Sequence, residues 1–154
     1  MKNTYVMTLR LPKALGLDIE RYSVRTGHKP AKLGAIAVDE FIRRRRFPLI
    51  DFRDTIGGRV AYVKGTRLAV YWLVDAIKML RGSIQKASQL WDISPDKVRA
   101  ALHYAEVYPD EMKAMQEQED ANRVLLEKAE AALERAKALG KSNGTAKTKL
   151  KRGQ

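Results

Sequence analysis

The sequence predicts a mainly α-helical protein that begins with one short strand. Side chains alternate from Tyr5 to Leu11, later segments repeat apolar residues at helical spacing, and Pro, Gly and Ser stand at the segment ends. The chain has 154 residues and no cysteine, which excludes disulfides and thiolate metal sites. It has no secretory leader and no run near the roughly 20 apolar residues of a spanning helix, which predicts a cytoplasmic protein without a membrane partner.

The opening strand predicts pairing with a second chain. At a period of two, one face carries Met7, Leu9 and Leu11, and the other carries Val6, Thr8 and Arg10. A lone strand exposes its backbone edge, so its expected partner is the same strand of a second copy, in an antiparallel ribbon. Such a ribbon fits the major groove of double-stranded DNA.

Two helices are expected to follow. Pro12 opens a helix over about 12–26, and Gly27 ends it. Pro30 opens a second helix that runs into four arginines, Arg43 to Arg46. The inner residues of the first helix would be Leu15, Ile19 and Tyr22, and those of the second Leu33, Ile36, Ala37 and Phe41. The second helix is apolar on most sides from 33 to 42, which favours a helix enclosed by a partner chain.

The net charge of +12 is concentrated at the two ends of the chain. Residues 1–47 hold eleven Lys and Arg against four Asp and Glu, and residues 140–154 hold five against none. Residues 48–110 hold nine Lys and Arg against seven Asp and Glu, and residues 111–139 hold five Lys and Arg against seven Asp and Glu. The basic N-terminal block predicts contact with phosphates. Its expected phosphate-binding residues are Lys2, Lys29, Lys32, Arg43 and Arg44.

Residues 4–44 resemble the ribbon-helix-helix family of MetJ, Arc and CopG type repressors. The strand exit Arg10-Leu11-Pro12, the Gly27 turn and the two helix lengths carry the resemblance. It implies a β-α-α domain over residues 1–46 in which two chains intertwine. It also implies that the start of the second helix holds a phosphate and that three strand residues face the bases, namely Val6, Thr8 and Arg10.

Residues 47–110 predict a small helix-turn-helix domain. A strand over 59–63 lies between glycine turns, and helices are expected over about 67–80, 84–91 and 95–107, with Ser83 and Ser94 as N-caps. The first of these helices has a core stripe of Val70, Leu73, Val74 and Ile77. The last turns Val98, Ala101, Leu102 and Ala105 inward, and its outer residues are further candidate DNA contacts: Lys97, Arg99 and His103.

Residues 50–112 resemble the prokaryotic family catalogued as domain of unknown function 433, which includes VapB-type antitoxins. The resemblance rests on Ile50-Asp51-Phe52-Arg53-Asp54, on the run from Tyr62 to Val70 and on the run from Val98 to Tyr104. It implies a helix-turn-helix module with a short β-hairpin. It also implies a protein partner, a PIN-like ribonuclease toxin.

The last part of the chain is expected to be a long helix over 111–139 and a disordered basic tail over 140–154. At 1.5 Å per residue the helix would span about 44 Å. One side of this helix carries an apolar stripe of Leu125, Ala129, Ala132, Leu133 and Ala136. A single helix cannot bury such a stripe, so it should contact the rest of the dimer or another protein. Because a PIN-like nuclease gathers carboxylates around its metal, the basic tail would suit that site. The expected toxin contacts are Leu125, Ala129, Leu133, Ala136, Lys147, Lys149, Lys151 and Arg152.

No catalytic residue, metal site or cofactor is expected. The two histidines, His28 and His103, lack a nucleophile and a carboxylate arranged around them by the sequence. The predicted function is a toxin-antitoxin system antitoxin that binds its own operator as a homodimer or higher oligomer. The alternatives are a stand-alone DNA-binding regulator or plasmid-partition protein, and a structural scaffold with solubilising basic ends.

Overall fold

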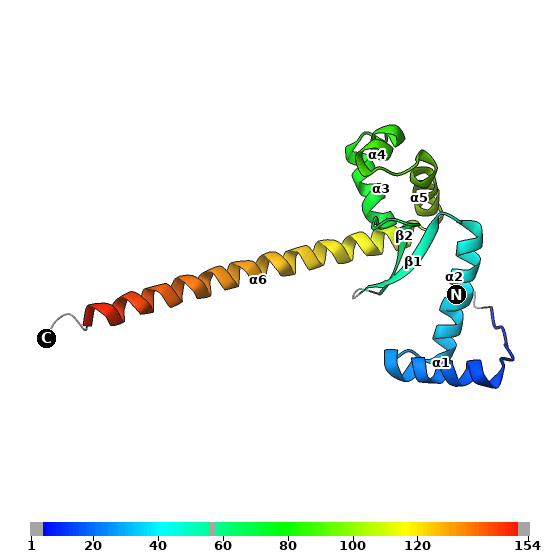
Figure 1. Ribbon diagram of the computed structural model, residues 1–154, viewed down its shortest axis with the longest axis horizontal. Helices are drawn as coiled ribbons and strands as arrows, with labels where there is room; N and C mark the ends of the chain where they lie inside the picture. The colour runs from blue at the N-terminus through cyan, green and yellow to red at the C-terminus, as the bar shows by residue number, and fades with distance from the viewer. Residues whose placement is uncertain (1–4, 56–57, 151–154) are drawn as a thin grey trace. The chain divides into compact units, whose positions relative to one another are not determined.

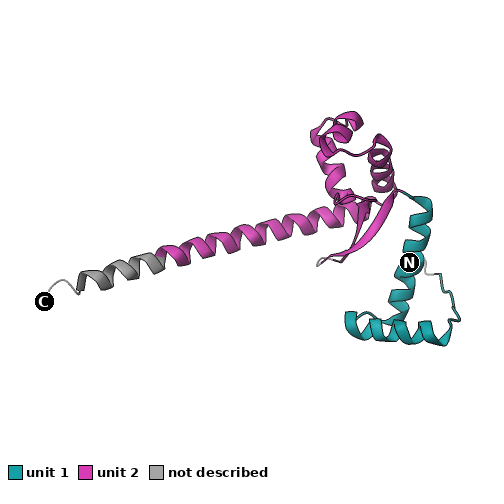
Figure 2. Cartoon of the chain, viewed as in Figure 1, with its two compact units in different colours: residues 1–48 teal, residues 49–154 magenta. Residues whose placement is uncertain are grey.

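The computed structural model describes residues 5–55 and 58–150, and the surroundings of side chains up to residue 138. Six helices and one two-stranded antiparallel sheet make up this described part, which confirms the predicted mainly helical class (Figure 1). The chain divides into two compact units, residues 1–48 and 49–154 (Figure 2). None of the described helices is both long and apolar enough to cross a membrane.

Unit 1 contains the two helices predicted for it, α1 (Lys13–Thr26) and α2 (Pro30–Arg46). Gly27 ends α1 in the left-handed conformation, with φ of 69°, and its N–H donates to the carbonyl of Ser23 at 2.9 Å. The Ser23 hydroxyl donates to the carbonyl of His28 at 2.6 Å. The turn between the helices is therefore held by one glycine and one serine.

Residues 5–12 have no regular secondary structure, and all eight are exposed. The strand expected here is absent from the described single chain. A strand is held by hydrogen bonds to a neighbouring strand, and the expected neighbour belongs to a second copy. The ribbon therefore stays a prediction.

Unit 2 begins with the hairpin of β1 (Ile50–Thr55) and β2 (Gly58–Val63). The register pairs Ile50 with Val63, Phe52 with Ala61 and Asp54 with Arg59. The last pair is also an ion pair of 3.0 Å. Ile50 and Phe52 alternate with more exposed residues, so β1 turns one face to the core.

The helix expected over 67–80 is shorter, because a side chain holds the turn before it. It is α3 (Val70–Met79). The Thr66 hydroxyl donates to the carbonyl of Val63 at 2.8 Å and accepts from the N–H of Leu68 at 3.0 Å. These bonds keep residues 66–69 in a turn, and the helix starts after it.

The next two helices, α4 (Ile84–Trp91) and α5 (Pro95–Val107), match their predicted ranges and caps. The Ser83 hydroxyl accepts from the N–H of Lys86 at 3.3 Å. The Ser94 hydroxyl accepts from the N–H of Lys97 at 3.4 Å. Each serine satisfies one amide that the helix itself leaves unpaired.

The core of unit 2 lies between the hairpin, α3 and α5, and Tyr104 is at its centre. Tyr104 is fully buried. The centre of its ring lies 6.2 Å from the ring centre of Phe52 and 4.8 Å from the ring centre of Tyr108. Val98 and Ala101 are buried as predicted, whereas the expected inward residues of the last turns, Leu102 and Ala105, are only half-buried. The inward face of α5 therefore runs through Tyr104.

The last helix, α6 (Pro109–Leu150), begins earlier and ends later than expected. Its first turns contact α3 and α5, and Met112 is buried. Residues 121–138 are all exposed. The helix continues through Gly140 to Leu150, a range for which a disordered tail was expected; the disorder of the free tail stays a prediction. The expectation for 151–154 lies outside the described residues.

The core predicts the effect of a truncation at Leu73, which is fully buried. Leu73→Ala should lower the free energy of unfolding of unit 2 by about 2–5 kcal/mol through lost contacts and a cavity. The matched control is Leu90→Ala on α4, since Leu90 is 63% exposed, and it should change stability by under about 0.5 kcal/mol. Both tryptophans, Trp72 and Trp91, lie in unit 2, so denaturation followed by their fluorescence reports this unit. Equal losses in both variants would contradict the assignment of the core.

Candidate nucleic-acid and partner surfaces

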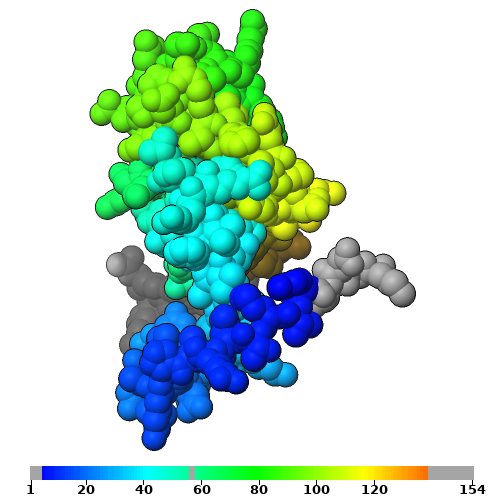
Figure 3. Space-filling view, turned by 90° about the vertical axis from the view of Figure 1, so that its right-hand side faces the viewer, coloured from blue at the N-terminus to red at the C-terminus, as the bar shows by residue number. Residues whose placement is uncertain are grey.

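The N-terminal segment presents its side chains to solvent. Tyr5 is 90% exposed and Val6 is 83% exposed, and Thr8 and Arg10 are exposed as well. On the face drawn in Figure 3 the dark blue atoms of this segment lie uncovered. The predicted base-facing residues are therefore accessible, whereas Lys2 lies outside the described residues.

The two helices of unit 1 have no buried residue. Leu15 is 46% exposed and Phe41 is 61% exposed, although both belong to the predicted inner faces. Ile19 and Ile36 are only half-buried. Burial of apolar surface stabilises a fold by roughly 25 cal/mol per Å². A pair of helices that buries so little needs a further surface to cover it, and a second chain can supply one.

The start of α2 brings two lysines beside backbone amides. The N–H groups of Lys32 and Leu33 both donate to the carbonyl of Lys29, at 2.9 and 3.1 Å. The amide of Ala31, one residue earlier, has no acceptor within the helix, as is usual for a first turn. Lys29 and Lys32 are exposed. This combination of helix amides and cations is typical of sites that attract phosphate oxygens.

The arginine run at the end of α2 is partly neutralised. Nε of Arg43 lies 2.8 Å from Oδ2 of Asp39, and Nη2 of Arg44 lies 3.8 Å from Oε2 of Glu40. Arg45 stacks over the ring of Phe41, with 5.7 Å between the guanidinium carbon and the ring centre. The carboxylates one turn earlier lower the attraction of Arg43 and Arg44 for phosphate relative to the expectation from sequence.

Helices α4 and α5 are joined by a short turn over residues 92–94 and so have the arrangement of a helix-turn-helix. Asp92 ends α4 in the left-handed conformation, with φ of 49°. The Ser88 hydroxyl donates to the carbonyl of Ile93 at 2.6 Å, and the Ile93 side chain is buried between the helices' ends. The turn is thus short and held at both sides.

The charges of this helix-turn-helix are balanced. Residues 84–107 hold three Lys and Arg and three Asp and Glu. Nη1 of Arg99 lies 2.6 Å from Oδ1 of Asp96, and Nδ1 of His103 lies 3.9 Å from Oε2 of Glu106. Lys97 is half-buried. These three predicted DNA contacts therefore do not form a basic surface.

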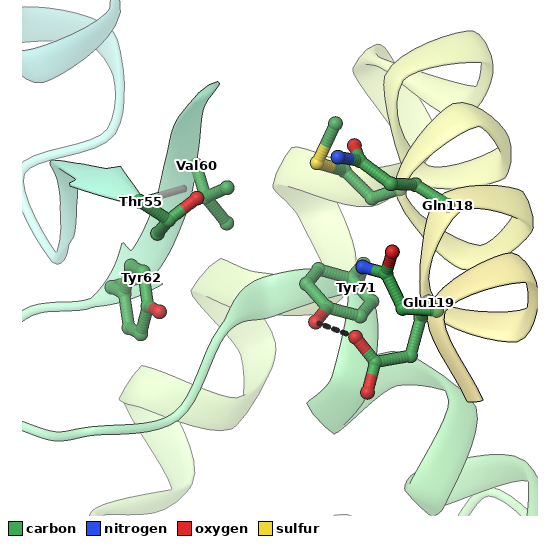
Figure 4. A pocket seen from close by; sticks show the side chains of 8 residues that line it. Thr55, Val60, Tyr62, Tyr71, Gln118 and Glu119 are labelled. Atoms are coloured by element: carbon green, nitrogen blue, oxygen red, sulfur yellow. Dashed lines mark hydrogen bonds between the residues drawn. The ribbon is translucent and has the colours of Figure 1, made fainter. Parts of the chain in front are cut away.

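A groove lies between the hairpin, α3 and the first part of α6. Its volume is about 470 Å³. In Figure 4 the side chains of Thr55, Val60 and Tyr62 on the hairpin stand across from Glu119 on α6, with Tyr71 between. The remaining lining residues come from α6 as well: Met115, Gln118 and Asn122.

Tyr71 and Glu119 interact across this groove. The Tyr71 hydroxyl donates to Oε2 of Glu119 at 3.2 Å. Partial burial of the hydroxyl raises the pKa of Tyr71 above its usual 10.0, and the negative charge of Glu119 raises it further. The neutral phenol therefore serves as the hydrogen-bond donor at physiological pH.

The stripe predicted to bind a protein partner is exposed where it can be seen. Leu125 is 64% exposed and Leu133 is 56% exposed, and Ala129 and Ala136 are exposed too. Lys147 and Lys149 lie within the helical range of α6, but the structure describes side-chain surroundings only up to residue 138. Lys151 and Arg152 lie outside the described residues.

Sequence reasoning missed the groove, because its lining comes from the hairpin, from Tyr71 and from α6, and more than forty residues separate Tyr71 from Met115. The one local signal was Tyr62 and Tyr71 on either side of the Gly65-Thr66 turn. Within the described residues no group of three or more His, Asp or Glu side chains could hold a metal ion. Comparison with protein-family models, with curated proteins and with solved structures finds no match.

The groove predicts a late titration of Tyr71. The pKa of Tyr71 is higher in the folded chain than in the unfolded chain. The protonated hydroxyl of Tyr71 therefore contributes fully to the stability of the fold below the unfolded pKa, and this contribution is lost as the pH rises through the folded pKa. The tyrosinate absorbance of the chain minus that of Tyr71→Phe should rise at a higher pH than that of free tyrosine. Glu119→Gln should move this rise to lower pH. A Tyr71 signal at or below the usual pH would contradict the contact.

Proposed function

We propose that this chain is a dimeric DNA-binding repressor of its own operator that also acts as a type II antitoxin. One observation carries the DNA-binding part: the two helices of unit 1 have exposed apolar faces and no buried residue, and the exposed segment before them carries Arg10. A second copy would cover the apolar faces and would give residues 5–12 a strand to pair with.

In such a dimer the paired segments form a ribbon that enters the major groove. Arg10 donates to guanine and Thr8 contacts a base edge or a thymine methyl. Lys29, Lys32 and the amide of Ala31 at the start of α2 bind phosphates, which orients the ribbon and makes affinity depend steeply on salt. Unit 1 supplies the base contacts, because the charges of α4 and α5 are balanced.

The antitoxin part is supported by the exposed arm of α6. Residues 121–138 project beyond the core of unit 2 with Leu125, Leu126 and Leu133 uncovered. An amphipathic helix of this kind binds in an apolar groove of a partner, and the lysines that follow suit a partner rich in carboxylates, such as a PIN-like nuclease. The alternative is a regulator or plasmid-partition protein whose arm has no toxin to bind.

Substitution of Arg10 tests the ribbon. Arg10→Ala should weaken binding to the upstream DNA of its own gene by about 1–3 kcal/mol and reduce sequence preference, because it removes a base contact. Lys32→Ala should weaken binding to all DNA alike and lower its salt dependence. Arg99→Ala on α5 is the matched control and should bind normally. Unchanged affinity and selectivity for Arg10→Ala in gel shifts would rule out the ribbon.

Phe41 tests the dimer of unit 1. Phe41→Asp should abolish specific DNA binding and reduce helix content by circular dichroism, since it places a carboxylate in the proposed interface. Leu90→Asp is the control, because Leu90 is equally exposed, at 63% against 61%, but lies on unit 2. If both variants bind DNA like the parent, unit 1 does not dimerise through this face.

Truncation tests the arm. A chain that ends after Arg123 keeps Met112, Glu119 and the core of unit 2. It should bind operator DNA but no longer protect cells from a toxin encoded beside it, because the apolar arm is gone. Tryptophan fluorescence checks that unit 2 remains folded. Full protection by the truncated chain would move toxin binding to another surface and would leave the DNA-binding proposal intact.

A further inference from the structure

We propose that α6 pairs antiparallel with the α6 of a second copy of this chain. The seam consists of Leu126, Ala129, Leu133 and Ala136. These residues follow one another at spacings of three, four and three, which places them on one side of the helix. Leu126 is 61% exposed and Leu133 is 56% exposed, so no described part of their own chain covers them. This surface is additional to the dimer of unit 1. It contains leucines that the proposed function assigns to a toxin, so a toxin bound there would displace the second copy.

The alternation of large and small side chains selects the direction of pairing. In a parallel two-fold pair each residue meets its own copy, so layers of two leucines alternate with layers of two alanines. In an antiparallel pair centred on residue 131, Leu126 meets the partner's Ala136 and Ala129 meets the partner's Leu133. Each layer then holds one large and one small side chain, and the helices keep a constant separation.

Charge selects the same direction. In this register residues 112–121 of one chain lie level with residues 141–150 of the other. The first stretch holds three carboxylates against one lysine, whereas the second holds three lysines and no acidic residue. Antiparallel pairing therefore brings opposite charges together at both ends. Parallel pairing would bring like charges together, which is unfavourable.

The groove of unit 2 continues this seam toward the start of α6. Met115, Glu119 and Asn122 precede Leu126 at spacings of four, three and four, and all three line the groove (Figure 4). The partner's residues 140–147 would lie level with them. That stretch contains Gly140 and Gly144. The seam and three of the residues that line the groove therefore lie along one side of α6.

Cross-linking tests the pairing, since the chain has no cysteine of its own. An equimolar mixture of Leu126→Cys and Ala136→Cys chains should form disulfides between the two variants under mild oxidation. Each variant alone should not, because the two equivalent positions lie about 15 Å apart in this register and a disulfide needs Cα atoms within about 7 Å. Both positions are exposed, so neither substitution disturbs the core.

The control pair is Glu127→Cys with Arg135→Cys, which lies at matching levels on the other side of α6. This mixture should give little disulfide. Strong cross-linking of Ala136→Cys alone would show parallel pairing and overturn the proposal. No cross-link in the seam mixture, with capture of a neighbouring gene's protein instead, would assign the seam to a foreign partner. Neither result depends on DNA binding, which the Arg10→Ala gel shifts measure separately.

Discussion

The Tyr104 side chain connects the layers of unit 2. It is fully buried on α5, its ring contacts Phe52 of β1, and its hydroxyl donates to Oε1 of Glu111 at 2.9 Å. One residue thus joins the hairpin, the helix-turn-helix and the first turns of α6. The hydrogen bond to Glu111 fixes the first turn of α6 against α5, and the ring contact with Phe52 fixes the hairpin against the same helix.

The two helices of unit 1 have no comparable residue. They end where local signals place them, but none of their side chains is buried within the chain. The two units therefore obey different constraints. Unit 2 has a buried core between its hairpin and helices, whereas the apolar faces of α1 and α2 are exposed. The same contrast separates Met112 in the first turns of α6, which is buried, from residues 121–138, which are all exposed.

Local features were predictable from the sequence and distant contacts were not. Gly27, Ser83 and Ser94 mark helix ends because each acts on amides or carbonyls within a few residues. The delayed start of α3 depends on the Thr66 hydroxyl, and the inward turn of Tyr104 depends on the hairpin. The groove joins segments far apart in the sequence, so no pattern could reveal it. The four-residue spacing of Asp39 and Arg43 already indicates an ion pair on one face of α2. The prediction that Arg43 binds phosphate did not take this pair into account.

The lack of buried residues in α1 and α2 also makes the proposed repressor responsive to its own abundance. A fold completed only by a second chain forms in proportion to the square of the monomer concentration, whereas unit 2 folds independently of concentration. On dilution the operator-reading end would be lost first and the rest of the chain would persist. Operator occupancy would then rise steeply over a narrow range of protein level, so the cell would hold transcription near a set point without a separate signal.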